Sequence, residues 1–177
     1  MQNPFITAPR LAVLIDAENI SPAWSAQLMA QVAERGAATI RRAYADWAEA
    51  ASRQRQLLNL GVELVHVNSK RGKNAADIRI VIDALELLFN DKNSFSHVLL
   101  VSGDGDFTEL VHRLRAHGKN VIGMGISGTS AEYLVNACDK FIYYDKLQGI
   151  NKPKKNPQNG NGQNQNQPAA QKPKEKE

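Results

Sequence analysis

Residues 11–16 read Leu-Ala-Val-Leu-Ile-Asp, five apolar residues followed at once by an aspartate. A short and nearly continuous apolar run is typical of a strand that is buried on both faces of a parallel sheet. Ligands of open α/β sheets bind outside the carboxyl ends of such strands. We therefore expect Asp16 to lie at the ligand-binding edge of a sheet, although a turn residue after a strand is the ordinary alternative.

The rest of the chain up to residue 147 alternates apolar runs with helical patterns. Further runs lie at residues 38–44, 62–67, 97–101, 121–126 and 141–144. Five helices are expected between these runs, and their start signals are Ser21-Pro22, Asp46 with Glu49, Asn74, Asp106 with Glu109, and Thr129 with Glu132. The first, second and fourth helices are expected to end at Gly36, Gly61 and Gly118, and the third covers residues 75–90. This alternation predicts an α/β fold, a Rossmann-like three-layer sandwich with a mostly parallel sheet of order about 3-2-1-4-5.

Three more aspartates are expected near Asp16 at that edge. Asp104 and Asp106 follow the fourth run in Ser-Gly-Asp-Gly-Asp-Phe, and Asp77 follows the third run at the start of a helix. Clustered carboxylates repel one another unless a divalent cation neutralises them, and oxygen ligands suit Mg²⁺ or Mn²⁺. We predict that Asp16, Asp77, Asp104 and Asp106 are metal ligands and catalytic residues for phosphate chemistry.

Each of these aspartates also has an ordinary interpretation. Asp77 could simply favour a helix N-terminus, and Asp106 could be a helix N-cap. Asp104 lies between two glycines, which leaves its carboxylate accessible. Asp83 is about 120° around the helix from Asp77, so we expect it outside the site, and we expect Glu18 to point away from it.

The charge of the chain is unevenly distributed. The net charge is +4, and residues 151–177 hold six lysines and two glutamates, so the other residues sum to zero. That stretch has no aliphatic or aromatic side chain larger than alanine or proline, which predicts a disordered tail over 148–177. We expect an extension at 1–9, one domain at 10–147, no membrane span or secretory signal, and a cytoplasmic location.

Several other enzyme classes lack support in this sequence. Its four histidines are not at zinc-ligand spacing, and neither a Walker loop nor a Gly-x-Ser-x-Gly motif is present. A haloacid-dehalogenase-like phosphatase also uses an aspartate after the first strand. That class needs a different spacing from Asp16-Ala17-Glu18 and from Asp104-Gly105-Asp106, so it remains a minor alternative.

Three segments together resemble the NYN domain, a branch of the PIN-like nuclease superfamily. They are residues 14–20 (Leu-Ile-Asp-Ala-Glu-Asn-Ile), residues 72–77 (Gly-Lys-Asn-Ala-Ala-Asp) with 81–85, and residues 102–107 (Ser-Gly-Asp-Gly-Asp-Phe). The resemblance covers about 10–145 and implies a PIN-like fold and a Mg²⁺- or Mn²⁺-dependent ribonuclease. It implies that Asn19 and Ser102 support the four aspartates. In similar bacterial proteins a LOTUS domain often follows, and here the tail takes that place.

The expected substrate is RNA, in single-stranded form. Lys70, Arg71 and Lys73 precede Asp77 and are candidate phosphate contacts, with a solvated loop as the alternative. Tyr44 and Trp47 could stack on unpaired bases, with core packing as the alternative. A catalytically weak RNA-binding or scaffolding module is the competing function, and the oligomeric state stays open.

Overall fold

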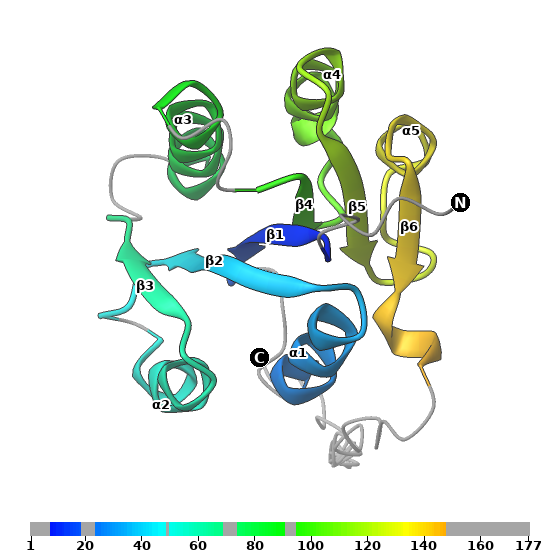
Figure 1. Cartoon of the computed structure of the whole chain (residues 1–177). Helices are drawn as coiled ribbons and strands as arrows, with labels where there is room; N and C mark the ends of the chain where they lie inside the picture. Colours follow the sequence, from blue (N-terminus) through cyan, green and yellow to red (C-terminus); the bar gives the residue numbers. More distant parts are fainter. Residues whose placement is uncertain (1–7, 19–23, 49, 69–73, 91–94, 148–177) are drawn as a thin grey trace, which may run out of the picture.

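The structure is a computed structural model that describes residues 8–18, 24–48, 50–68, 74–90 and 95–147. Strands and helices alternate along these residues, as Figure 1 shows. The strands are β1 (Arg10–Asp16), β2 (Ala37–Ala45), β3 (Glu63–His66), β4 (His97–Val101), β5 (Asn120–Gly125) and β6 (Lys140–Tyr143). The helices are α1 (Ser25–Ala33), α2 (Ala51–Asn59), α3 (Ala75–Asn90), α4 (Thr108–Ala116) and α5 (Glu132–Ala137), with 3-10 turns η3 (Gly105–Phe107) and η4 (Tyr144–Lys146).

The six strands form one parallel sheet in the order β3-β2-β1-β4-β5-β6. The predicted α/β class and strand order are confirmed, and β6 extends the sheet beyond β5. The switch in winding direction falls between β1 and β4, where Ile15 pairs with Val101. Because these neighbours are parallel, the segments that follow them leave the sheet side by side, which is the usual ligand position of such folds.

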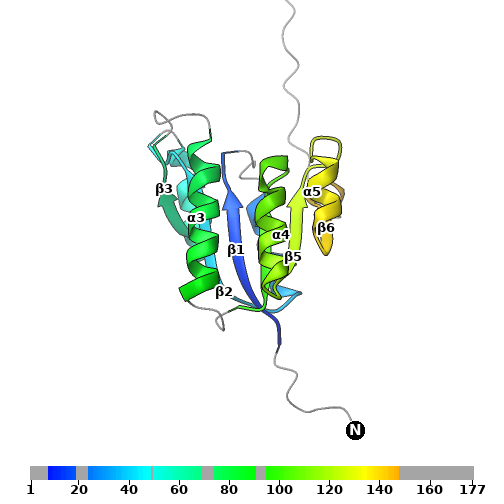
Figure 2. The ribbon, with the colours of Figure 1, turned by 90° about the horizontal axis from the view of Figure 1, so that it is seen from above.

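Helices cover both faces of the sheet. Figure 1 shows α3, α4 and α5 on one side and α1 and α2 on the other, and Figure 2 shows α3 and α4 lying across the first of these faces. Successive side chains of a strand point to opposite faces, so β1 contributes to two cores. Ala12 and Leu14 pack under α3 and α4, whereas Leu11, Val13 and Ile15 join the core that holds Trp24 and Leu28, which lie at α1.

The predicted helix boundaries differ in accuracy. Asn74 directly precedes α3, as expected, and the backbone oxygen of Asn74 accepts a hydrogen bond from the amide of Ile78. The predicted capping box at Asp46 is wrong, because α2 begins only at Ala51 and Asp46 Oδ1 instead accepts a hydrogen bond from the amide of Ala48 at 3.2 Å. A short acidic side chain that bonds its own local backbone forms a turn before the helix rather than its cap.

The last helix also begins later than predicted. Thr129 does not cap α5, which has Ala131 at its N-cap, and the Thr129 hydroxyl donates to the oxygen of Ile126 instead. The start predicted at Ser21-Pro22 lies outside the described residues, as do the tail and most of the N-terminal extension. Among the residues that the structure describes, no helix is both long and apolar enough to span a membrane.

Candidate active site

Asp16 is the most deeply buried acid at the carboxyl edge of the sheet. It is the last residue of β1, and its side chain is 0% exposed because β2 and β4 flank it and helices cover both faces. The hydroxyl of Ser102, the residue after β4, donates a hydrogen bond to Asp16 Oδ2 at 3.1 Å. Ser102 Oγ in turn accepts from the amide of Asp104 at 3.2 Å. Ser102 therefore links the ends of β1 and β4 at the position where sequence analysis placed it.

Asp104 and Asp106 lie on the short turn that connects β4 to α4. Asp104 is the N-cap of η3, and its Oδ1 accepts a hydrogen bond from the amide of Asp106 at 2.9 Å. The expectation that Asp106 is the cap is therefore wrong. Asp104 has the extended backbone that a cap needs, whereas Asp106 already lies within the first turn with an exposed side chain.

Asp77 reaches this edge from the first turn of α3. Its pKa is raised to about 6, first by burial and then by the charges of Asp16, Asp104, Asp106 and Glu18. A negative neighbour acts in this way only at short range, so the four predicted acids share one electrostatic environment. Glu18 belongs to the same environment, and the expectation that it points away is not supported. The position of Glu18, two residues after the end of β1, was the feature of the sequence that could have placed it near the other acids.

The cluster suits a hard cation by its chemistry. Every member offers carboxylate oxygens, the ligands that Mg²⁺ and Mn²⁺ prefer, and the mutual repulsion around Asp77 is what a bound cation would relieve. The hydrogen bonds to Asp16 and Asp104 each occupy one oxygen, and a carboxylate has about four lone-pair sites. Within the described ranges, no three acidic, histidine or cysteine side chains converge as a ready-made metal site. The residues therefore fit a cation in charge and donor type, without a preassembled ligand shell.

Two hollows flank the cluster. One, of about 420 Å³, lies on the β4–β5 side and is bordered by Ser102 and Asp104. The other, of about 260 Å³, lies on the α3 side and is bordered by Asp77 and Asp106. The acids therefore stand between two spaces that are large enough to receive parts of a ligand.

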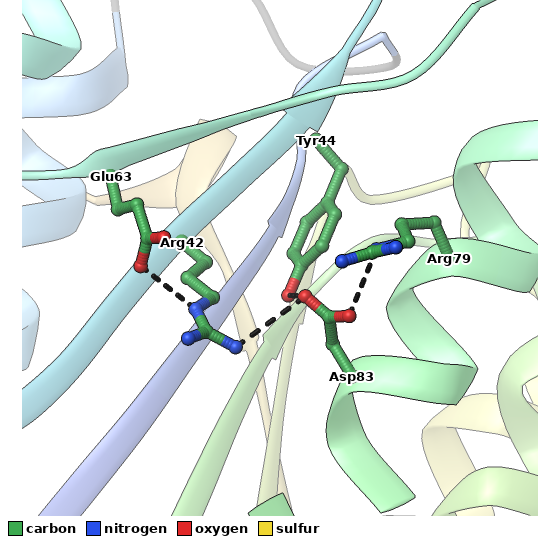
Figure 3. A network of polar contacts seen from close by, with 5 residues as sticks. All are labelled: Arg42, Tyr44, Glu63, Arg79 and Asp83. Atoms are coloured by element: carbon green, nitrogen blue, oxygen red, sulfur yellow. Dashed lines mark hydrogen bonds and ion pairs between the residues drawn. The ribbon is translucent and has the colours of Figure 1, made fainter. Parts of the chain in front are cut away.

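Asp83 lies apart from the four acids, as expected, but it is buried rather than at the surface. Figure 3 shows it among Arg42 and Tyr44 of β2 and Arg79 of α3, with Glu63 of β3 beyond Arg42. Asp83 Oδ2 accepts from the Tyr44 hydroxyl at 3.1 Å and from Arg42 at 3.4 Å. Arg79 Nε lies 2.9 Å from Oδ1 as an ion pair without hydrogen-bond alignment, and Arg42 also donates to Glu63 at 2.8 Å. Arg42 therefore pairs with one acid of β3 and one of α3.

The aromatic residues proposed for base stacking belong to the core instead. Tyr44 is 0% exposed with its hydroxyl on Asp83, and Trp47 is 6% exposed with its indole nitrogen donating to the oxygen of Val65. Neither ring can stack on a base, because both lie inside the packed domain. The predicted support Asn19 and the predicted phosphate contacts Lys70, Arg71 and Lys73 lie outside the described residues.

Sequence reasoning overlooked Tyr133 on α5. Its side chain is 62% exposed, yet its hydroxyl lies against Gly105. A Cβ atom built on Gly105 would lie 2.0 Å from Tyr133 Oη, so only glycine leaves room for the ring beside Asp104 and Asp106. An exposed tyrosine at the edge of an acidic site is a candidate ligand contact. The glycine between the two aspartates was the signal for it in the sequence.

Comparisons with known proteins identify the family of the chain and agree with its fold. A family model described as the NYN domain matches residues 10–145. Over 66 residues the chain is 38% identical to the Low amplitude and bright protein LabA of Synechococcus elongatus, a stretch that is 37% of this chain and 33% of that protein. This chain thus matches about a third of that relative's length.

A solved structure supports the fold alone. A protein of unknown function from Vibrio parahaemolyticus matches with a TM-score of 0.62 and 23% identity, over 82% of this chain and 98% of that chain. The family match spans most of the chain and contains every predicted site residue. The chain therefore belongs to the NYN domain family, within the PIN-like nuclease superfamily, whose function is related to RNA.

Proposed function

We propose that this protein is a metal-dependent ribonuclease that hydrolyses phosphodiester bonds of single-stranded RNA. The observation that carries the proposal is the position of Asp77 amid the charges of Asp16, Asp104, Asp106 and Glu18 at the switch point of the sheet. Membership of the NYN family makes RNA the expected substrate. A pair of carboxylates could serve a turn or a cap, but acids from three separate segments have no shared structural duty there.

Each acid would have a distinct part in holding Mg²⁺ or Mn²⁺. Asp16 is rigid, because it is buried and bonded to Ser102, and it would be the shared central ligand. Asp77, Asp104 and Asp106 would complete the ligand set from α3 and η3. Bound divalent ions in such a site supply a water activated near neutral pH and relieve charge on the leaving oxygen. Hydrolysis of this kind leaves a 5′-phosphate and a 3′-hydroxyl.

The residues of the site differ in how far they are buried, and their negative charge affects how RNA can bind. Asp16 and Ser102 are closed off from bulk solvent, whereas Asp106 is exposed and Asp77 is half-buried. The negative charge of the acids would repel an RNA strand, so we expect productive binding to require the cation. Lys70, Arg71 and Lys73 remain proposed phosphate contacts.

The test is cleavage of end-labelled single-stranded RNA by the purified full chain with Mn²⁺ or Mg²⁺. We expect products that disappear with EDTA and with Asp104→Asn. Glu86→Gln, which removes an exposed charge from α3 away from the cluster, is the matched control and should cleave normally. Equal cleavage by the wild type and Asp104→Asn would remove Asp104 from the site. Intact RNA in every lane, with folded protein, would overturn the nuclease proposal.

A second candidate is an RNA-binding module without strong catalysis. The observation that favours it is that no three ligand-type side chains converge among the described residues. Calorimetric titration with Mn²⁺ separates the two functions. Binding that is lost in Asp16→Asn supports the nuclease, whereas RNA binding that is indifferent to Mn²⁺ and to this variant supports the binding module.

A further inference from the structure

The hollow on the β4–β5 side of the acids has no assigned role. It measures about 420 Å³ and opens between the ends of the two strands, the loop after β5 and the start of α5. It borders Asp104 directly, and its inner wall includes Tyr144. The pKa of Tyr144 is raised to about 12 by burial and then by the charges of Asp145 and Asp16, so the inner wall also lies close to Asp16.

The lining of the hollow indicates what kind of group it could hold. None of its described lining side chains is cationic, and Asp104 stands at its border, so a phosphate would find repulsion there and no partner. Ile126 and Ala131 supply partly exposed apolar surface, and Thr129 supplies a hydroxyl at an exposed position, whereas Met124 and Tyr144 border the hollow but are almost fully buried. A neutral, flat group with hydrogen-bonding edges meets these conditions, and a nucleobase is such a group.

The walls of the hollow are held in place before any ligand arrives. In the loop after β5, the amide of Ser127 donates to Asp145 Oδ1 at 2.8 Å, and the Ser127 hydroxyl donates to the second carboxylate oxygen. On the opposite side, the amide of Ala131 donates to the oxygen of Gly103 at 2.9 Å. A preformed pocket loses less entropy on binding than a loop that must be ordered.

Tyr133 is an exposed aromatic residue that contacts the border of the hollow. Its ring is 62% exposed and lies over Gly105, which itself borders the hollow. An aromatic ring that remains exposed beside acidic residues gains nothing from core packing, but it can stack on any base. Gly105 is thus in contact with Tyr133 and also borders the hollow.

We propose that this hollow, with Tyr133 at its edge, binds one nucleobase of the RNA strand next to the phosphate held at the acids. The inference rests on the proposed function and deepens it, because it names the part of the molecule that positions the substrate. Tyr133 is then a binding residue, and the loop at Thr129 forms the wall that faces the base. Because stacking tolerates every base, the pocket positions the strand with little sequence preference.

The test measures base stacking separately from cleavage. Short single-stranded RNAs carry one 2-aminopurine, moved through successive positions, and are titrated with full-length protein in Mg²⁺. The protein carries Asp77→Asn, on the other side of the cluster, to prevent cleavage. Tyr133→Leu removes the ring, and Thr129→Trp fills the mouth of the hollow. Phe89→Leu is the matched control, because Phe89 is a 53% exposed aromatic residue near the far end of α3. Thermal unfolding verifies that each variant is folded.

We expect the fluorescence of one labelled position to be quenched on binding, and Tyr133→Leu to remove the quenching and weaken binding about tenfold, the size of one lost stacked base. Thr129→Trp should do the same, and Phe89→Leu should change neither quantity. RNA that binds with unchanged quenching in Tyr133→Leu and Thr129→Trp would overturn the base pocket and leave the ribonuclease proposal standing. RNA that binds neither these variants nor the protein with Asp77 intact would overturn both.

Discussion

Asp77 and Asp83 lie six residues apart on the same helix, in opposite electrical surroundings. Around Asp83 the chain supplies its own compensation, with Arg42, Arg79 and the Tyr44 hydroxyl on the carboxylate. Around Asp77, every charge that shifts its pKa among the described residues is negative. A buried acid with built-in partners stabilises a fold only while those partners remain. Acids that raise one another's pKa, as those around Asp77 do, have a stability cost, which makes sense where a ligand provides the opposite charge.

The largest expected effect concerns activity. Asp104→Asn should lower the rate of RNA cleavage by at least about 1000-fold, because a neutral amide is a poor ligand for a hard cation. Asp83→Asn should lower it by less than about tenfold, because the partners of Asp83, which are Arg42, Tyr44 and Arg79, are not members of the cluster. Single-turnover cleavage with protein in excess gives both rates. Equal losses in the two variants would erase the distinction between the two groups of acids.

The second-largest effect concerns stability, and here we expect Asp83 to matter more than Asp104. Asp83→Ala should lower the free energy of unfolding by about 3 kcal/mol. The substitution leaves the buried Tyr44 hydroxyl without its hydrogen-bond acceptor, and it leaves Arg42 without the buried carboxylate with which it pairs. Asp104→Asn should change that free energy by less than about 0.5 kcal/mol, since asparagine caps a helical turn as well as aspartate does. Urea unfolding of both proteins measures the difference. A stable Asp83→Ala variant would show that the network adds little.

A smaller effect should depend on pH. Because the pKa of Asp77 is about 6 in the folded protein and 3.8 ordinarily, folding favours its protonated form. This contribution is fully present below about pH 4 and is lost as pH rises to about 6. In EDTA, Asp77→Asn should therefore be more stable than wild type by about 1 kcal/mol at pH 7, after allowance for solvent screening. The difference should vanish near pH 4.

Thermal unfolding in EDTA at several pH values checks this sign. Glu86→Gln is the control, because it removes an exposed acid from the same helix away from the cluster and should not reproduce the gain of Asp77→Asn at pH 7. Saturating Mn²⁺ should stabilise the wild type more than Asp77→Asn. A variant that is less stable than wild type at pH 7 in EDTA would contradict the repulsion inferred around Asp77.

The smallest effect lies within the compensated network. Arg79 is 51% exposed and one helical turn from Asp83, so Arg79→Met should cost only about 0.5 kcal/mol. Arg42 is 26% exposed and serves both Glu63 and Asp83, so Arg42→Met should cost about 1–2 kcal/mol. Urea unfolding at low and high salt separates the contributions of Arg79 and Arg42 to stability, since screening should remove most of the Arg79 contribution. A larger cost for Arg79→Met would reverse the assigned order.

The contrast also explains which site residues could be predicted. Asp16 and Asp104 stand next to the ends of the two strands at the switch point, so the predicted strand order was enough to place them at one edge. That Asp77 joins them depends on how α3 packs, which strand order does not decide. Tyr44 and Trp47 were misjudged because an aromatic residue near a strand end has the same local sequence whether it faces the core or the solvent. Tyr133 was overlooked because its contact with Gly105 spans 28 positions of the chain.

By itself, the sequence determined the alternation of strands and helices, the parallel sheet and the edge at which the acids gather. These features follow from local hydrophobic periodicity and from the handedness rule for parallel connections, which operate within a few dozen residues. Only the tertiary structure decided that Asp83 has cationic partners while Asp77 has acidic neighbours, and that a hollow and an exposed tyrosine lie beside Asp104. Burial and charge compensation depend on which distant side chains pack together, and no local pattern encodes those pairings.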